Sequence, residues 1–324
     1  MKAIVYRQYG SPDQLQLQDI PIPVPQDDEV LVKIQAASIN SWDWDLVIGK
    51  QLLLRLIGGL RKPRHVVLGA DIAGRVEAVG KNVRFFQPGD EVFGDIAESG
   101  FGGFAEYVVT KEKLLARKSP AMTFTQAAAL PQAGLLALQG LRHFGRVMPG
   151  QRILINGAGG GVGTLALQLA KSAGAEVTCV DLASKFDMLR GLGADHCIDY
   201  TVLDYTRTGE QYDKVLDVIA HRKVADYKRA LRPGGTFTMI GGSMGWLLFQ
   251  MMVLAPLIPA GSGRKLGIMG YRPKREDLDL LTQLFEAGQL QPVIDREYPL
   301  ADTADAFRYF GTGKVMGKVV IATP

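Results

Sequence analysis

The sequence predicts an α/β protein with two parts, a β-rich, barrel-like domain and a domain built on a doubly wound parallel sheet. The first observation is that short runs of β-branched residues, separated by glycine and proline, fill roughly the first 120 residues. The second is that strand-like runs alternate with helical stretches from about residue 122 onward, as in a parallel sheet covered by helices. The third is that the end of the chain returns to the strand-rich style of its beginning.

The elements follow in order along the chain. N-terminal strands are expected in KAIVY and EVLVKIQAASIN, with turn signals in PIPVPQDD and QPGDEVFG. In the middle, RILIN, AEVTCVD, HCIDY, YDKVLDVI and GTFTMIGG are interpreted as strands, and TLALQLAKSAG and KVADYKRALRPGG as helices. The terminal run GKVVIAT resembles the N-terminal strands. We therefore expect residues 1–121, completed by 295–324, to form the β-rich domain, and residues 122–294 to form the α/β domain.

Composition narrows the class of protein. The 324 residues are 47% hydrophobic and 22% charged, which indicates a globular protein long enough for two cores. The net charge of +4 is too diffuse to predict a nucleic-acid partner. Cys179 and Cys197 form no C-x-x-C pair, which argues against a disulfide framework and a structural zinc. The N-terminus has no apolar core of signal-peptide length and the run 246–260 is too short to span a bilayer, so we expect a cytoplasmic protein.

A glycine loop marks the first candidate site. LINGAGGGVGTLALQLAK places five glycines from Gly157 to Gly163, between a predicted strand and a predicted helix. Glycine lets the backbone approach a ligand closely, and the N–H groups and dipole of a helix start attract a phosphate. The fingerprint positions i, i+2 and i+5 hold Ala158, Gly160 and Gly163, so alanine replaces the first glycine. The predicted contact set is completed by Gly161 and Val162, whereas Gly157 and Gly159 are interpreted as spare flexibility.

An acidic residue beyond the loop strengthens this interpretation. Asp181 ends the next predicted strand, 18 residues after Gly163, close to the spacing expected of an acid that binds the adenosine ribose. No Gly-Lys-Ser/Thr follows the loop, which excludes a P-loop. The sequence therefore favours a dinucleotide site, with a tight turn in an unrelated α/β fold as the alternative.

Motifs along nearly the whole chain resemble those of the medium-chain dehydrogenase/reductase superfamily, in its quinone oxidoreductase branch. GAGGGVGTLALQLAKSAGAEV is similar to the signature G-G-V-G-x-x-x-x-Q-x-A-K, with Gln168 and Lys171 in place. Further matches, in order, are MKAIVYRQYGSPDQLQL, LGADIAGRVEAVGKNVRFFQPGDEVFG, GGFAEYV, LGADHCIDY, LRPGGTF and GKVVI. The resemblance implies a GroES-like catalytic domain, a Rossmann domain, and an NAD(P)(H) cofactor in the cleft between them.

The zinc ligands of the alcohol dehydrogenase branch are missing from the sequence. That branch uses a Cys after the early strands and the His of a Gly-His-Glu triplet, but here the triplet reads Gly69-Ala70-Asp71 and the Cys region reads NSWDWDL. His65 is interpreted as a surface or loop histidine. A metal normally polarises a carbonyl for hydride attack. Quinones and α,β-unsaturated carbonyls delocalise the incoming charge and depend more on positioning, so we expect these acceptors and no metal.

The segment INSWDWDL supplies the candidate catalytic residues. In the quinone oxidoreductases it reads roughly N-x-x-D-x-Y and faces the nicotinamide, so the resemblance implies site roles for Asn40 and Asp43. Asp45 stands where the tyrosine would be, which argues against a tyrosine proton donor. We expect Asn40 to position the substrate and Asp43 to be structural or orienting. Asp45 is a proton relay if burial raises its pKa, and a solvated loop acid otherwise.

The residues after the second strand of the α/β domain decide between NADH and NADPH. Asp181 would bind both ribose hydroxyls of NADH and repel a 2′-phosphate. Ser184 and Lys185 favour NADPH, although an exposed lysine contributes only about 1 kcal/mol. The balance predicts a slight preference for NADH. Further cofactor contacts are expected at Tyr200, Val218 and Gly241.

The remaining features concern substrate and assembly. The apolar stretches 51–60 and 246–260 are interpreted as core, subunit contact, substrate lining or a peripheral membrane contact. Flat walls for an aromatic quinone are expected from Trp42, Trp44 and Trp246. RKLGIMGY (264–271) resembles the strand through which the family pairs Rossmann sheets, and it predicts a homodimer.

Taken together, the residues predict a zinc-independent oxidoreductase that transfers hydride from NAD(P)H to a quinone or an α,β-unsaturated carbonyl. Two alternatives stay open at this point. One is an NAD(P)-dependent alcohol or carbonyl dehydrogenase that works without zinc, and the other is a non-catalytic nucleotide-sensing protein.

Overall fold

A computed structural model describes residues 1–50, 55–56, 58–242, 251 and 263–323. The chain divides into two compact units: unit 1 comprises Met1–Leu135 and Pro273–Pro324, and unit 2 comprises Leu136–Arg272. The sequence placed the boundaries elsewhere, after residues 121 and 294. The difference arises because two helices assigned to the α/β domain bind the β-rich part. Helix α3 (Phe124–Ala128) packs on β3 and β4, and Arg275 of α9 (Arg275–Glu286) donates from Nε to the Leu115 carbonyl at 2.9 Å.

Unit 1 is built on a mainly antiparallel sheet. Its described strands run in the order β14-β15-β3-β4-β5-β7, with β6 also paired to β3, while β1 (Lys2–Val5) and β2 (Gln16–Asp19) form a separate antiparallel pair. The sheet strands are β3 (Glu29–Ser38), β4 (Asp71–Val79), β5 (Glu91–Asp95), β6 (Tyr107–Lys111), β7 (Leu115–Arg117), β14 (Ile294–Pro299) and β15 (Lys318–Ala322). The terminal strand β15 lies in the same sheet as the N-terminal strands, because it pairs antiparallel with β3. Helices α1 (Ser41–Ile48) and α10 (Thr303–Phe310) also belong to this unit.

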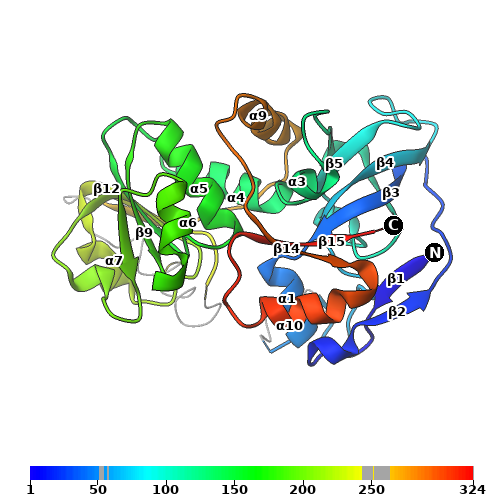
Figure 1. Cartoon of the computed structure of the whole chain (residues 1–324), viewed down its shortest axis with the longest axis horizontal. Coiled ribbons are helices and arrows are strands. Elements are labelled where there is room, and N and C mark those ends of the chain that lie inside the picture. The colour runs from blue at the N-terminus through cyan, green and yellow to red at the C-terminus, as the bar shows by residue number, and fades with distance from the viewer. Residues whose placement is uncertain (51–54, 57, 243–250, 252–262, 324) are drawn as a thin grey trace. The chain divides into compact units, whose positions relative to one another are not determined.

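Unit 2 is built on a parallel sheet whose described strands run in the order β10-β9-β8-β11-β12-β13. The strands are β8 (Arg152–Asn156), β9 (Glu176–Asp181), β10 (His196–Asp199), β11 (Tyr212–Asp217), β12 (Leu231–Met239) and β13 (Lys265–Ile268). Strand order reverses between β8 and β11, the signature of a doubly wound sheet. Helix α5 (Gly161–Ser172) packs on β8 and β9, and α7 (Val224–Arg229) packs on β12 (Figure 1). The predicted fold class is confirmed.

Two further helices are α6 (Phe186–Gly191) and α4 (Pro131–Arg142). Helix α6 packs against β10, and α4 begins in unit 1 and ends in unit 2. The core of unit 2 is formed by buried apolar and aromatic side chains such as Leu154, Val180 and Phe237. That of unit 1 is contributed largely by the inward faces of its strands.

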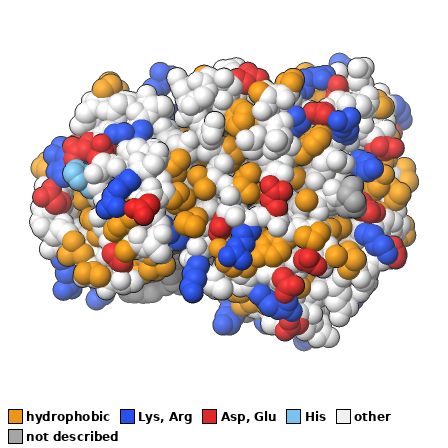
Figure 2. Space-filling view, viewed as in Figure 1, with side chains coloured by type: hydrophobic (Ala, Val, Ile, Leu, Met, Phe, Trp, Pro, Cys, Tyr) orange, Lys and Arg blue, Asp and Glu red, His pale blue; other side chains and the backbone are white. Residues whose placement is uncertain are grey.

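The surface of the molecule carries both signs of charge (Figure 2), and much of its apolar stretches lies outside the described residues. Acidic and basic side chains are interspersed on the face shown in Figure 2. Among the described residues, no helix has the length and apolar character needed to cross a membrane. The run 246–260, including Trp246, lies outside the described residues apart from Met251, and so do residues 51–54 and 57 of the other apolar stretch.

Candidate active site

The glycine loop joins β8 to α5 and has the shape of a cradle. Gly157 adopts φ 80°, a backbone conformation that favours glycine, and Gly160 is the N-cap of α5. A Cβ at Gly163 would collide with the carbonyl oxygen of Gly157 and the backbone of Ala158, so this glycine lets the helix start pack on the loop. A Cβ at Gly160, by contrast, would meet nothing closer than 3.7 Å. The loop therefore keeps open space beside the N–H groups of the α5 start, where Gly161 and Val162 lie.

The interpretation of Gly157 and Gly159 as spare flexibility was wrong. Gly157 needs its positive φ, and a Cβ at Gly159 would collide with the side chain of Lys185 and lie 3.0 Å from Asp181 Oδ2. The backbone angle at Gly157 favours glycine, and a larger residue in place of Gly159 would force the Lys185 side chain to move. The structural roles of these two glycines depend on the backbone angles and on side chains that follow the neighbouring strand. The sequence of the loop alone does not show which of its glycines have such roles.

Asp181 and Lys185 form a buried pair against the loop. The Asp181 carboxylate ends β9 and accepts hydrogen bonds from the backbone N–H groups of Gly159 at 2.7 Å and Leu182 at 2.9 Å. Lys185 Nζ lies 3.1 Å from Asp181 Oδ1, and both side chains are less than a tenth exposed. The sequence predicts an exposed Lys185 that competes with Asp181, whereas in the structure Lys185 is buried and is the ion-pair partner of that carboxylate. Ser184 is exposed in the turn between them.

The other expected cofactor residues lie at or just beyond strand ends in unit 2. Val218 follows β11 and donates its N–H to the Asn156 carbonyl at 3.0 Å, and the Gly241 carbonyl accepts from Ala220 N at 3.0 Å. Tyr200 follows β10 and is 45% exposed. The carboxyl ends of parallel strands form the usual ligand edge of a doubly wound sheet. The glycine loop, Asp181, Val218 and Gly241 are thus brought to one edge.

A buried carboxyl group, that of Asp217, lies near this edge and is not among the predicted site residues. Asp217 ends β11 beside Asn156 of β8, and its Oδ1 accepts from Asn156 Nδ2 at 2.8 Å and from the Ile219 N–H at 3.1 Å. Tyr205 donates to Oδ2 at 3.3 Å. Complete burial raises the pKa of Asp217 to about 6. The available signal was a polar residue at the end of each of two adjacent apolar strands.

In unit 1, Asn40 and Asp43 are joined at the start of helix α1. Asn40 is the N-cap, and Asp43 Oδ2 accepts from its backbone N–H at 2.9 Å, while Asp43 Oδ1 accepts from the Gly69 N–H at 3.1 Å. Asp43 is fully buried, and this burial raises its pKa to about 7. The Asp43 carboxyl thus clamps two backbone segments together, which supports the orienting role expected of it.

The side chain of Asn40 belongs to a buried polar network that includes two residues not among the candidates. Asn40 Nδ2 donates to Asp71 Oδ2 at 3.0 Å, and Lys318 Nζ donates to Asn40 Oδ1 at 2.5 Å. Asp71 is 0% exposed and Lys318 is 4% exposed. The signal in the sequence was a charged residue beside each apolar strand run, in GADIAG and in GKVVI.

Asp45 lies on a different side of α1 from the core-facing residues. Asp43, Leu46 and Val47 are buried, whereas Asp45 is partly exposed. Partial burial nevertheless raises the pKa of the Asp45 carboxyl. The pKa of Asp45 is therefore shifted in the direction that a proton relay requires.

Aromatic side chains surround the same helix. The Phe101 ring contacts two other rings. Its centroid lies 5.4 Å from that of Trp42 and 5.3 Å from that of His65. Burial lowers the pKa of His65, which favours the neutral form of the ring in this aromatic contact. Trp44 instead contacts Phe310 of α10, with ring centroids 6.4 Å apart. Trp42 and His65 thus share one aromatic partner, Phe101, whereas Trp44 packs on α10.

The donor set at the zinc position of the alcohol dehydrogenase branch does not fit zinc. Ala70 offers no side-chain donor, and Asp71 is occupied by hydrogen bonds from Ser38, Asn40, Lys318 and the Gln132 backbone. Within the part of the chain that the structure describes, no three His, Cys, Asp or Glu side chains are grouped to hold a metal ion.

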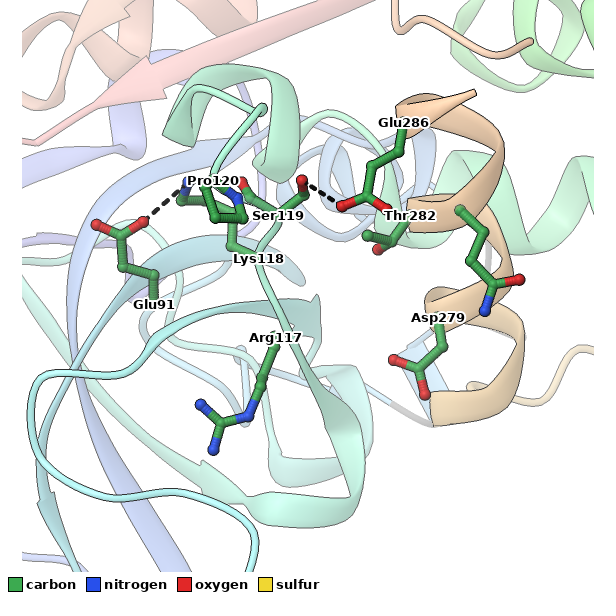
Figure 3. A pocket seen from close by; sticks show the side chains of 9 residues that line it. Glu91, Arg117, Lys118, Ser119, Pro120, Asp279, Thr282 and Glu286 are labelled. Carbon is green, nitrogen blue, oxygen red and sulfur yellow. Dashed lines mark hydrogen bonds and ion pairs between the residues drawn. The ribbon is translucent and has the colours of Figure 1, made fainter. Parts of the chain in front are cut away.

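A pocket of about 630 Å³ in unit 1 contains none of the expected site residues (Figure 3). It lies between the end of β7 and helix α9. Several of its polar groups are paired with one another: Lys118 Nζ lies 2.9 Å from Glu91 Oε2, and Ser119 Oγ donates to Glu286 Oε1 at 2.6 Å. These pairs fasten α9 and the strand ends together within unit 1.

Comparison with known proteins places the chain in a family. Residues 26–120 match the family described as alcohol dehydrogenase GroES-like domain, and residues 192–321 match the zinc-binding dehydrogenase family. The chain is 35% identical to 2-methylene-furan-3-one reductase of Solanum lycopersicum, over 99% of this chain and 79% of that protein. It is 33% identical, with the same coverage, to the chloroplastic NADPH-dependent alkenal/one oxidoreductase of Arabidopsis thaliana.

A solved structure agrees with these relatives. The quinone oxidoreductase of Coxiella burnetii superposes with a TM-score of 0.88 at 30% identity, covering 100% of this chain and 99% of that one. The fold and the glycine cradle define a nicotinamide-dependent oxidoreductase. The chain belongs to the medium-chain dehydrogenase/reductase superfamily, in its quinone oxidoreductase-like branch, which confirms the predicted family.

Proposed function

We propose that the protein reduces quinones or α,β-unsaturated carbonyls with NAD(P)H and without zinc. The observation that carries the proposal is the glycine cradle with the Asp181 carboxylate beside it, in a chain related to enzymes named for enone, alkenal and quinone substrates. The nicotinamide, when bound, supplies a hydride, and the acceptor takes this electron pair into an enolate or hydroquinone oxygen. A proton from water or a side chain completes the reduction. The Asp71 environment supports zinc independence, because its carboxylate is committed to protein donors.

The proposal assigns roles to the two units separately. Unit 2 binds the dinucleotide through the glycine loop, Asp181, Val218 and Gly241. Unit 1 holds the acceptor, with Asn40 positioning its carbonyl and Asp43 fixing the start of α1. The cytoplasmic location and the homodimer stay predictions, the second testable by the mass of the protein in solution.

The substrate class is tested by an acceptor screen. Oxidation of NADH and NADPH is followed by the absorbance of the reduced nicotinamide, with 1,2-naphthoquinone, 3-buten-2-one and a 2-alkenal as acceptors. The same absorbance follows the reduction of NAD(P)⁺ by simple alcohols. We expect turnover with the conjugated acceptors and none with the alcohols. Turnover of alcohols alone would favour the dehydrogenase alternative, and nucleotide binding without any hydride transfer would favour the sensing protein.

Asp45 is proposed as the proton relay, because partial burial raises its pKa. In Asp45→Asn we expect kcat for an enone to fall by about tenfold to a hundredfold, within the range of general acid catalysis. The alkaline limb of the pH–rate profile should also be lost, since the protonated carboxyl is the active form. The exposed Asp187→Asn substitution is the matched control. An unchanged pH–rate profile for Asp45→Asn would show that Asp45 is a partly solvated acid without this role.

NADH is the proposed cofactor, because the Lys185 ammonium is already paired with Asp181 and must leave it to reach a 2′-phosphate. In Asp181→Ser that partner is lost, and the freed Lys185 can meet a phosphate. We expect the ratio of kcat/KM for NADPH over NADH to rise at least tenfold, equivalent to about 1.4 kcal/mol. Asp187→Ser, in the following helix, is the control. An unchanged ratio would contradict the role of the pair.

A further inference from the structure

Lys318 is a buried cation in unit 1, and its ammonium group contacts Asn40 and two groups next to Asn40. It begins β15, and its Nζ donates to three acceptors: the Ile39 carbonyl at 3.2 Å, Asn40 Oδ1 at 2.5 Å and Asp71 Oδ2 at 3.4 Å. An ammonium has three N–H donors, so these contacts use all of them. The pairing of β15 with β3 brings this lysine beside the end of β3, where Ile39 and Asn40 follow the strand.

Asp71 balances the charge of Lys318 and is equally committed. Its Oδ2 accepts from Ser38 Oγ at 3.1 Å and from Asn40 Nδ2 at 3.0 Å, and its Oδ1 accepts from the Gln132 backbone N–H at 2.9 Å. Removing such a pair of charges from water carries a large desolvation penalty, which their attraction often fails to exceed. Stability alone is therefore a weak explanation for a lysine and an aspartate at this position.

The pair has a geometric consequence for Asn40. A lysine ammonium only donates hydrogen bonds and a carboxylate only accepts them, so the carboxamide oxygen must face Lys318 and the amide nitrogen must face Asp71. A flipped amide would place an N–H against an ammonium and an oxygen against a carboxylate. One N–H of Asn40 Nδ2 donates to Asp71. The direction of the second N–H is then fixed by the orientation of the amide plane. The ammonium also polarises the amide, which makes that N–H a stronger donor.

We propose that Lys318 is a positioning residue that, with Asp71, locks the amide of Asn40 so that its second N–H donates to the carbonyl oxygen of the acceptor. This inference rests on the proposed function. It extends that function, because Lys318 then helps to determine how the acceptor oxygen is held. Negative charge develops on that oxygen during the reduction.

The test is a double-mutant cycle with a reducible enone, 3-buten-2-one, as the probe. Lys318→Met removes the ammonium and keeps an apolar stem, and we expect kcat to fall at least tenfold while the Kd for NADH, measured by fluorescence, is unchanged. Lys318→Arg, which keeps a charged donor, should recover part of the loss. Lys314→Met, the same change at an exposed site four residues earlier, should have no effect.

The decisive comparison is made in an Asn40→Ala background. If Lys318 acts through Asn40, Lys318→Met causes no further loss of kcat there. Equal losses in both backgrounds, or full activity of Lys318→Met, would overturn the inference. If Lys318→Met does not fold, Lys318→Met/Asp71→Asn removes both charges and enters the same cycle. A wild-type protein that reduces no acceptor refutes the proposed function and this inference together, whereas an active wild type with an additive cycle refutes only the inference.

Discussion

Replacing Gly160 by alanine is expected to abolish tight dinucleotide binding while leaving the protein folded. Gly160 has φ −88°, which alanine accepts, and an added Cβ would meet no atom closer than 3.7 Å. The methyl group would instead occupy the open side of the loop, where the pyrophosphate must approach the N–H groups of α5. We expect the Kd for NADH to rise at least tenfold and the free energy of unfolding to change by less than about 1 kcal/mol.

Two other glycines, one in the same loop and one at the end of α6, serve as controls for this result. In Gly163→Ala the Cβ collides with the loop backbone, so we expect weaker binding and also a loss of stability of about 1–3 kcal/mol. In Gly191→Ala, at the end of α6, the Cβ meets nothing within 4 Å, so binding should not change and the free energy of unfolding should rise by no more than about 1 kcal/mol. Calorimetric titration with NADH and denaturant unfolding measure the two quantities. Wild-type affinity in Gly160→Ala would show that the pyrophosphate does not lie against this loop.

The second large effect is a pH dependence of stability caused by Asp43. Burial raises the pKa of this carboxyl from 3.8 to about 7 in the folded protein. Between these two values the folded state holds a proton that the unfolded state has released. The Asp43 contribution to stability is therefore complete below about pH 4 and is lost as the pH rises to about 7. The slope approaches roughly 1.4 kcal/mol per pH unit in this window.

Asp43→Asn isolates this contribution. Other groups titrate in the same range, Asp217 among them, so the measured quantity is the difference in unfolding free energy between wild type and variant from pH 4 to pH 8. We expect the variant to be the less stable at pH 4, because an amide presents one oxygen to the two N–H groups of Asn40 and Gly69. The gap should narrow as the pH rises. A gap that widens with pH would mean that the ionised carboxylate, not the acid, is the form that the fold favours.

Much of unit 2 could be predicted from the sequence because its determinants are local. The strand, the glycine loop and the helix that follows are contiguous, and Asp181 lies within one further strand. The pairing of Asp181 with Lys185 was missed although it spans four residues, because a lysine in a polar turn is ordinarily solvated. Its burial follows from the close approach of the loop at Gly159.

The network in unit 1 could not be predicted in the same way. Asp71 and Lys318 are 247 positions apart, and only the registers of β4 with β3 and of β15 with β3 bring them to the same place. A pattern of apolar residues predicts that both runs are strands, but it does not state which strands are neighbours. The position of α9 in unit 1 has a related cause, since Arg275 donates to the carbonyl groups of Glu112 and Leu115 far upstream.

The position of β15 inside its sheet has a consequence for biosynthesis. This strand follows every other described strand in the chain, yet it lies between β14 and β3 rather than at an edge. As the polypeptide leaves the ribosome, the continuous unit 2 can finish its sheet while the N-terminal unit still waits for this strand. Until then the flank of β3 exposes unpaired backbone groups to other nascent chains. A chaperone that shields this flank should raise the yield of folded protein, and loss of the last strand should lead to aggregation rather than to a merely inactive enzyme.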